Sequence, residues 1–140
     1  RYWVHQYYSF CEDAQVNDYL SGFPMAVFAP EGSGPQTPIV FGLQDVGSPY
    51  GWNAGLVPTL LDMGIACVLV EVPLSGERSL VRSHQGNNAA AEIAALLQSG
   101  VAVDLSLVAA ACECVARDLA IARSEAAARH GLTGDRIALL

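Results

Sequence analysis

The chain is 140 residues long and 52% hydrophobic, and its 14 acidic and seven basic side chains give a formal net charge of −7. This charge, with no run of basic residues to offset it, argues against a nucleic-acid-binding class, because phosphate would be repelled. No stretch approaches the run of about 18 apolar residues that a membrane-spanning helix needs, since Gly, Pro or a charged residue interrupts each one. The length suits a single domain.

The first part of the chain predicts two short strands with a turn-like segment between them. Residues 1–10 are rich in aromatic side chains, which is typical of a strand, whereas residues 11–21 are polar and turn-like. Residues 24–30 form an apolar run bounded by prolines, and this predicts a strand near a sheet edge, where a missing backbone N–H is tolerated. Residues 31–38 are a loop by composition.

Residues 39–43 and 65–72 are the clearest strands in the sequence. Both segments are apolar on both alternating faces, as expected of strands that are covered on both sides. Between them, residues 52–63 have apolar side chains at helical spacing, with Pro58 suited to a first turn and Gly64 to a C-terminal stop.

Two helices and a final strand are predicted in the C-terminal half. Residues 89–98 predict a short Ala-rich helix, residues 104–130 one long helix that ends at Gly131, and residues 137–140 the opening of another buried strand. The apolar stripe of the long helix consists of Leu105, Val108, Cys112, Val115, Leu119 and Ala122. Because strands alternate with helices, the sequence predicts an α/β fold with a mostly parallel sheet and helices on both faces.

The four cysteines do not indicate a metal or redox site, and no cofactor is predicted. None of them has CxxC spacing, and Cys67 lies in an apolar run, where it is interpreted as a small buried hydrophobic residue. Cys112 and Cys114 would point to different sides of a helix. No signal peptide is visible in these residues, so the compartment stays open, with the cytoplasm favoured.

Ligands of open α/β sheets gather at the carboxyl ends of the strands, and two loops are predicted there, over residues 44–51 and 73–88. Asp45 and Glu71 suggest a carboxylate pair for Mg²⁺ or phosphorylation, but a receiver-type site would need a Lys, and the chain has none. His84 lies alone in a polar loop, where a histidine is usually solvated.

Three segments, taken in order, resemble a known family. Residues 38–48 are similar to the third strand and following loop of the α/β-hydrolases, and residues 60–79 to their helix, fourth strand and turn. There the family commonly shows an acidic residue, a Pro and Gly-x-x-Ser, matched here by Glu71, Pro73 and residues 76–79. Residues 131–140 resemble the lead-in to the nucleophile elbow. The resemblance covers residues 24–140.

The resemblance implies an oxyanion hole with one backbone N–H from the loop after the third strand. The candidate donors are Gln44, Asp45 and Val46. Many members have His-Gly there, and this chain has Gln44-Asp45 or Leu43-Gln44, depending on a one-residue choice of alignment. A carboxylate would oppose an oxyanion, so we expect the side chain of Asp45 to turn away from the site. An ordinary strand-to-helix loop is the alternative interpretation. Tyr50 and Trp52 are candidates to line an acyl pocket, and Trp52 would serve equally as packing for its helix.

The resemblance also implies that no member of the catalytic triad lies within these residues, because the elbow would follow Leu140. We therefore expect residues 1–140 to be the N-terminal part of one domain, completed by the rest of the same polypeptide. The expected function is that of a serine hydrolase, esterase- or peptidase-like, acting on small-molecule acyl esters or amides. A non-catalytic binding module of the same fold is the first alternative. A nucleotide-binding domain is less favoured, since no G-x-G-x-x-G or Walker loop follows a strand.

Overall fold

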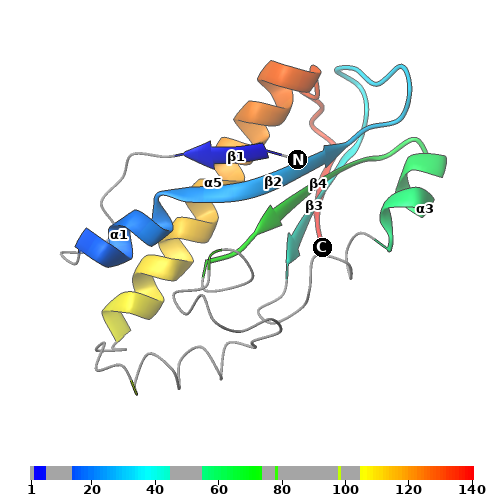
Figure 1. Cartoon of the computed structure of the whole chain (residues 1–140). Helices are drawn as coiled ribbons and strands as arrows, with labels where there is room; N and C mark the ends of the chain where they lie inside the picture. The colour runs from blue at the N-terminus through cyan, green and yellow to red at the C-terminus, as the bar shows by residue number, and fades with distance from the viewer. Residues whose placement is uncertain (1, 6–13, 45–54, 74–77, 79–97, 99–104) are drawn as a thin grey trace.

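Five strands form one sheet in the order β1-β2-β4-β3-β5 in the computed structural model, which describes residues 2–5, 14–44, 55–73, 78, 98 and 105–140 (Figure 1). The strands are β1 (Tyr2–His5), β2 (Gly22–Phe28), β3 (Ile39–Gln44), β4 (Ala66–Glu71) and β5 (Ile137–Leu139). The helices are α1 (Ala14–Leu20), α3 (Val57–Asp62) and α5 (Leu105–His130). The helix predicted over residues 89–98 lies outside the described residues except for Gln98, which is helical.

The sheet is mixed, so the prediction of a mostly parallel sheet is wrong. β2 is antiparallel to both of its neighbours, β1 and β4, whereas β3 is parallel to both β4 and β5. The physical reason lies in residues 29–38, which join β2 to β3 without a helix. Parallel strands need a crossover of about a dozen residues or more, so this short loop makes β3 run back against the direction of β2.

The helical cover of the sheet is also more uneven than predicted. α5 crosses one face (Figure 1), and its Ala122 and Ala126 pack in a cluster with apolar side chains of β2, β3 and β4. On the opposite face, the cluster of described residues draws its helical side chains from the six-residue α3 alone, around Val57. For the described residues, the predicted cover of helices on both faces is therefore corrected to the long α5 on one face and the short α3 on the other.

The strand predicted over residues 65–72 is confirmed as β4, and it is covered on both faces. Ala66, Val68 and Val70 face α5, while Cys67 and Leu69 join the cluster with α3. All six residues of β4 are buried. Because successive side chains of a strand point to opposite faces, only a strand inside a sheet with cover on both sides can bury such a run.

The long helix predicted over residues 104–130 is confirmed as α5, but its buried face differs from the predicted stripe. Among the side chains of α5 whose burial is described, the buried ones follow a four-residue step: Ala110, Cys114, Asp118, Ala122 and Ala126. Cys112 is exposed, and Leu119 is only partly buried. Small side chains let the helix approach the sheet closely, so size as well as hydrophobicity selects the face. The helix ends at Gly131, whose φ of 66° and bond to Ala127 O are typical of a left-handed C-terminal cap.

Two other predictions are corrected by the structure. Residues 11–21, predicted as turn-like, include the seven-residue helix α1, whose last residue, Leu20, is buried. The final strand forms as β5, but it is not buried: Ile137 is 39% exposed and Leu139 61%. β5 is exposed because it lies at the edge of the described sheet, next to β3 alone.

Candidate functional site

The carboxyl ends of three strands meet at one edge of the sheet. β3 and β4 are parallel and in a register that places Gln44 opposite Glu71. β5 lies parallel to β3 on its other side, where the N–H of Leu43 donates to Leu140 O at 3.0 Å and the N–H of Leu140 donates to Phe41 O at 2.9 Å. Ligand sites of open α/β sheets occupy this kind of edge.

Of the residues predicted to form an oxyanion hole, the structure describes the backbone of one. Gln44 is the last residue of β3, at the predicted edge. Asp45 and Val46 lie outside the described residues, as do the pocket candidates Tyr50 and Trp52. The assignment of these five residues to a site therefore stays a prediction.

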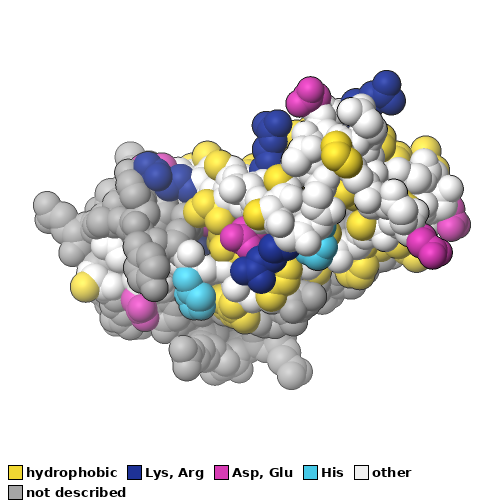
Figure 2. All heavy atoms as spheres, turned by 90° about the horizontal axis from the view of Figure 1, so that it is seen from above, with side chains coloured by type: hydrophobic (Ala, Val, Ile, Leu, Met, Phe, Trp, Pro, Cys, Tyr) yellow, Lys and Arg dark blue, Asp and Glu magenta, His cyan; other side chains and the backbone are white. Residues whose placement is uncertain are grey.

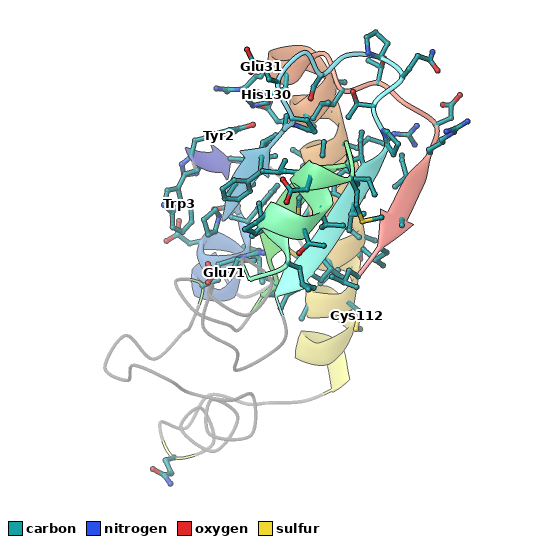
Figure 3. The ribbon with its side chains drawn as sticks, turned by 90° about the vertical axis from the view of Figure 1, so that its right-hand side faces the viewer. Tyr2, Trp3, Glu31, Glu71, Cys112 and His130 are labelled. Atoms are coloured by element: carbon teal, nitrogen blue, oxygen red, sulfur yellow. The ribbon has the colours of Figure 1, made fainter. Side chains whose placement is uncertain are left out.

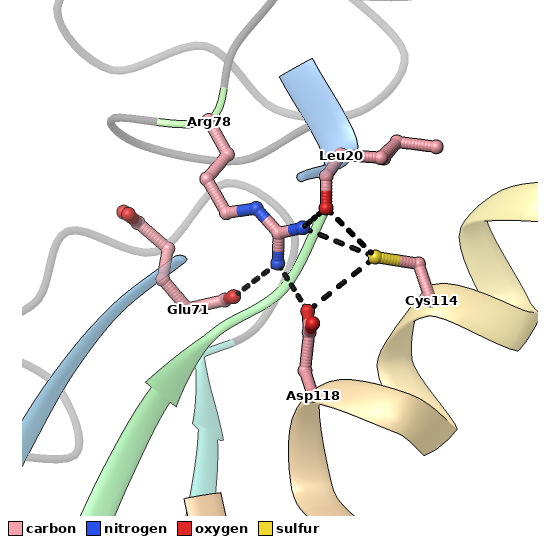
Figure 4. Close-up of polar contacts among 5 residues, drawn as sticks. All are labelled: Leu20, Glu71, Arg78, Cys114 and Asp118. Carbon is pink, nitrogen blue, oxygen red and sulfur yellow. Dashed lines mark hydrogen bonds and ion pairs between the residues drawn. The ribbon is translucent and has the colours of Figure 1, made fainter. Parts of the chain in front are cut away.

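A buried polar cluster lies at the same edge, between the end of β4 and α5 (Figure 4). At its centre the two terminal nitrogens of Arg78 donate four hydrogen bonds. Nη1 donates to the backbone oxygen of Glu71 at 2.9 Å and to Oδ2 of Asp118 at 2.5 Å. Nη2 donates to the backbone oxygen of Leu20 at 3.3 Å and to Sγ of Cys114 at 3.1 Å. Arg78 thus joins β4, α1 and α5.

Every member of this Arg78 cluster is withdrawn from water. Arg78 is 2% exposed, Glu71 and Asp118 are 1% exposed, and Cys114 is fully buried. The guanidinium carbon also lies 5.9 Å from the centre of the Phe23 ring, within the range of a cation–π contact. Burying a charge is costly unless it is paired and hydrogen-bonded, and the Asp118 carboxylate and the two backbone oxygens provide that compensation.

The cluster holds structure together and offers no reactive nucleophile. Burial raises the pKa of the Cys114 thiol to about 11, with the Arg78 guanidinium lowering it and the Asp118 carboxylate raising it further. A thiol in this state carries almost no thiolate at neutral pH, and thiolate is the nucleophilic form. The Glu71 side chain points away from the guanidinium, and only its backbone oxygen receives the bond (Figure 4).

From the sequence, Arg78 was predicted to lie in a turn, and Asp118 was not among the candidate residues. A signal was present, since Asp118 lies four residues after Cys114 and four before Ala122, in line with the small residues of α5. A carboxylate in that line has to be buried, and a buried carboxylate needs a cation. Which of the seven arginines supplies it is decided by the fold.

The other described charges are exposed or scattered. On α5, Arg117 pairs with Glu113 at 3.5 Å and Arg129 with Glu125 at 2.5 Å. On the face seen in Figure 2 the described Arg side chains lie apart from one another. Tyr2 of β1 stacks on His130, the last residue of α5, with ring centroids 6.5 Å apart (Figure 3).

The described part of the chain contains neither a cluster of metal-binding side chains nor a helix that could span a membrane. Its His, Cys, Asp and Glu side chains include no group of three or more that would hold a metal ion. None of its helices combines the length and apolar character required to cross a membrane. No family model, curated protein or solved structure matches the chain.

Proposed function

We propose that this chain forms the oxyanion-hole side of a serine hydrolase of the α/β-hydrolase type, acting on small-molecule acyl esters or amides. The nucleophile, the base and the acid are proposed to follow Leu140 in the full polypeptide. The observation that carries the proposal is the parallel pairing of β3 with β5, in which Phe41 lies opposite Leu139. Continued by three residues, this register brings Gln44 opposite the second residue after Leu140.

The pairing supports the proposal because an oxyanion hole needs two donors close together. In this family one donor is the N–H of the residue after the nucleophile, and the other comes from the loop after the third strand. Both must lie about 2.7–3.1 Å from one oxygen atom. Neighbouring strands are about 4.8 Å apart, so turns that follow β3 and β5 are near enough. A strand between them would separate the two turns by about 10 Å, which is too far for one oxygen.

In the proposed mechanism, residues 1–140 stabilise the negative charge that develops on the substrate. A Ser after Leu140 attacks the acyl carbonyl carbon, a His takes the hydroxyl proton, and an acidic residue orients the His. The carbonyl oxygen becomes an oxyanion, and a backbone N–H at Gln44, Asp45 or Val46 donates to it. When the oxyanion collapses, the bond from the acyl carbon to the ester oxygen or amide nitrogen breaks, and the His gives its proton to that leaving atom. A water molecule, deprotonated by the same His, then hydrolyses the acyl-serine. Tyr50 and Trp52 are proposed to contact the acyl chain.

A non-catalytic binding module is the second candidate, and one feature of the sequence favours it. In one of two possible alignments, Gln44-Asp45 stands where many family members have His-Gly. A carboxylate aimed at the developing negative charge would raise its energy. If the Asp45 side chain points into the site, the same edge would suit ligand binding without acyl transfer.

Labelling with a fluorophosphonate probe tests the proposal on the full polypeptide. We expect one labelled Ser, mapped by peptide mass spectrometry to a position after Leu140, and no label after heat denaturation. A labelled Ser within residues 1–140 would contradict the assignment. A folded protein that binds acyl compounds without reacting would support the binding module in its place.

A further inference from the structure

The structure assigns Arg78 a positioning role: its hydrogen bonds hold the end of β4 in place beside the end of β3, where the proposed oxyanion hole lies. This inference rests on the proposed function for the identity of the site. The contacts themselves are independent of it, since the guanidinium joins Glu71 O, Leu20 O and Asp118.

Glu71 lies at the edge of the sheet where the oxyanion hole is proposed. It is the last residue of β4 and lies opposite Gln44, the last residue of β3. A shift of the backbone at Glu71 would therefore be felt at the start of the loop that is proposed to supply the oxyanion donor. Arg78 donates directly to the Glu71 backbone oxygen, seven residues before it in the chain.

The guanidinium of Arg78 is itself held by two other elements of the fold. Asp118 fixes it from the middle of α5, and Leu20 O fixes it from the end of α1, just before β2 (Figure 4). β2 is the other neighbour of β4. The end of β4 is thus tied to a helix that crosses the sheet and to the end of α1, which leads into the adjacent strand, through the rigid planar geometry of an Arg fork.

The effect of Arg78 on the position of the site can be separated from its effect on the stability of the fold. A buried ion pair can be replaced by apolar side chains of similar size with little or no loss of stability. Such a replacement keeps the fold but removes the bonds to Glu71 O and Leu20 O. If Arg78 acts only as a structural element, activity returns with stability. If it positions the site, activity stays low, because a displacement of about 1 Å can cost about 100-fold in rate.

The test compares kcat, KM and thermal melting in the full polypeptide for Arg78→Lys and for the double variant Arg78→Met/Asp118→Leu. The double variant is expected to melt close to the wild-type temperature, with kcat about 100-fold lower and KM little changed. Arg78→Lys should also lower kcat, since an ammonium group has three donors and lacks the planar fork that bonds all four partners. The matched control is Arg117→Met/Glu113→Leu, an exposed pair of α5, which should leave kcat unchanged.

Amide hydrogen exchange at Glu71 and Val72 gives a readout without activity. We expect loss of protection there in the double variant and unchanged protection in the centre of β4. A double variant that folds, melts cooperatively and keeps the wild-type kcat would overturn the positioning role. Unchanged amide hydrogen exchange at Glu71 would overturn it too. A wild-type protein that does not react with fluorophosphonate would overturn the proposed function instead, while exchange would still decide whether Arg78 orders the end of β4.

Discussion

Arg78 and Asp118 form an ion pair at 2.5 Å in which each side chain is 1% exposed. Arg78 follows β4, and Asp118 lies in the middle of α5, so the pair joins the sheet edge to the helix that covers it. Removing one partner of such a pair leaves the other charge buried and uncompensated, which is much more costly than removing both. This asymmetry makes the pair easy to test.

Replacing Asp118 with Ala should destabilise the protein by about 3–5 kcal/mol, because the Arg78 charge stays buried without its carboxylate. Urea denaturation of the full polypeptide measures this free energy of unfolding. The control is Glu113→Ala, whose pair with Arg117 is exposed, and it should cost about 0–1 kcal/mol. Equal effects of the two changes would show that the burial of Asp118 has no energetic consequence.

The two neighbouring thiols of α5 should differ sharply in reactivity. Cys112 is exposed, whereas Cys114 is buried and the pKa of its thiol is raised to about 11. Two variants each keep one of these thiols: Cys114→Ala keeps Cys112, and Cys112→Ala keeps Cys114. Iodoacetamide at pH 8 should therefore alkylate Cys112 in the first variant much faster than Cys114 in the second. Peptide mass spectrometry measures the two rates, and similar rates would contradict the buried placement of Cys114.

The same pKa shift predicts how stability depends on pH. The folded-state pKa of Cys114 lies above its ordinary value of 9.0, so the folded protein holds this proton more tightly than the unfolded chain does. Its contribution to stability is complete below pH 9 and is lost as the pH rises toward 11. Urea midpoints across this window should fall less steeply for Cys114→Ala than for the wild type, and parallel curves would refute the shift.

The close approach of α5 to the sheet predicts an effect of side-chain size. Ala126 is fully buried in the main core, so Ala126→Leu should overpack it and cost about 1–3 kcal/mol. Ala128→Leu is the matched control, because Ala128 lies on the exposed side of the same helix. Thermal melting of the two variants distinguishes them. A larger loss at position 128 would mean that the helix is rotated from the described orientation.

Gly47→Pro tests the proposed oxyanion loop. A proline that distorts this loop should lower kcat by about 10²–10³-fold, the usual effect of losing one oxyanion donor, and should change KM much less. Gly34→Ala is the control, since an added Cβ there meets no atom within 4 Å in its loop. An unchanged kcat in Gly47→Pro would count against the assignment of the loop.

Local patterns were sufficient to predict where several elements begin and end. The run of apolar residues on both faces predicted β4, and the helical spacing before Gly131 predicted α5. Pro58 lies in the first turn of α3 and Gly64, at a φ of 75°, follows its end as expected, but the helix begins at Val57 and not at residue 52. These features depend on residues within one or two turns of each other, so sequence alone determines them.

The tertiary structure decided strand direction, the buried face of α5 and the partners of the charges. β2 runs antiparallel to β4, and Arg78 meets an Asp118 that lies 40 residues away in sequence. The sequence predicted Gln44 as the first residue of a loop, whereas it is the last residue of β3, and β5 was not predicted to be the neighbour of that strand. Such relationships depend on which distant segments bury surface together and which charges compensate one another once water is excluded, and no local pattern encodes that choice.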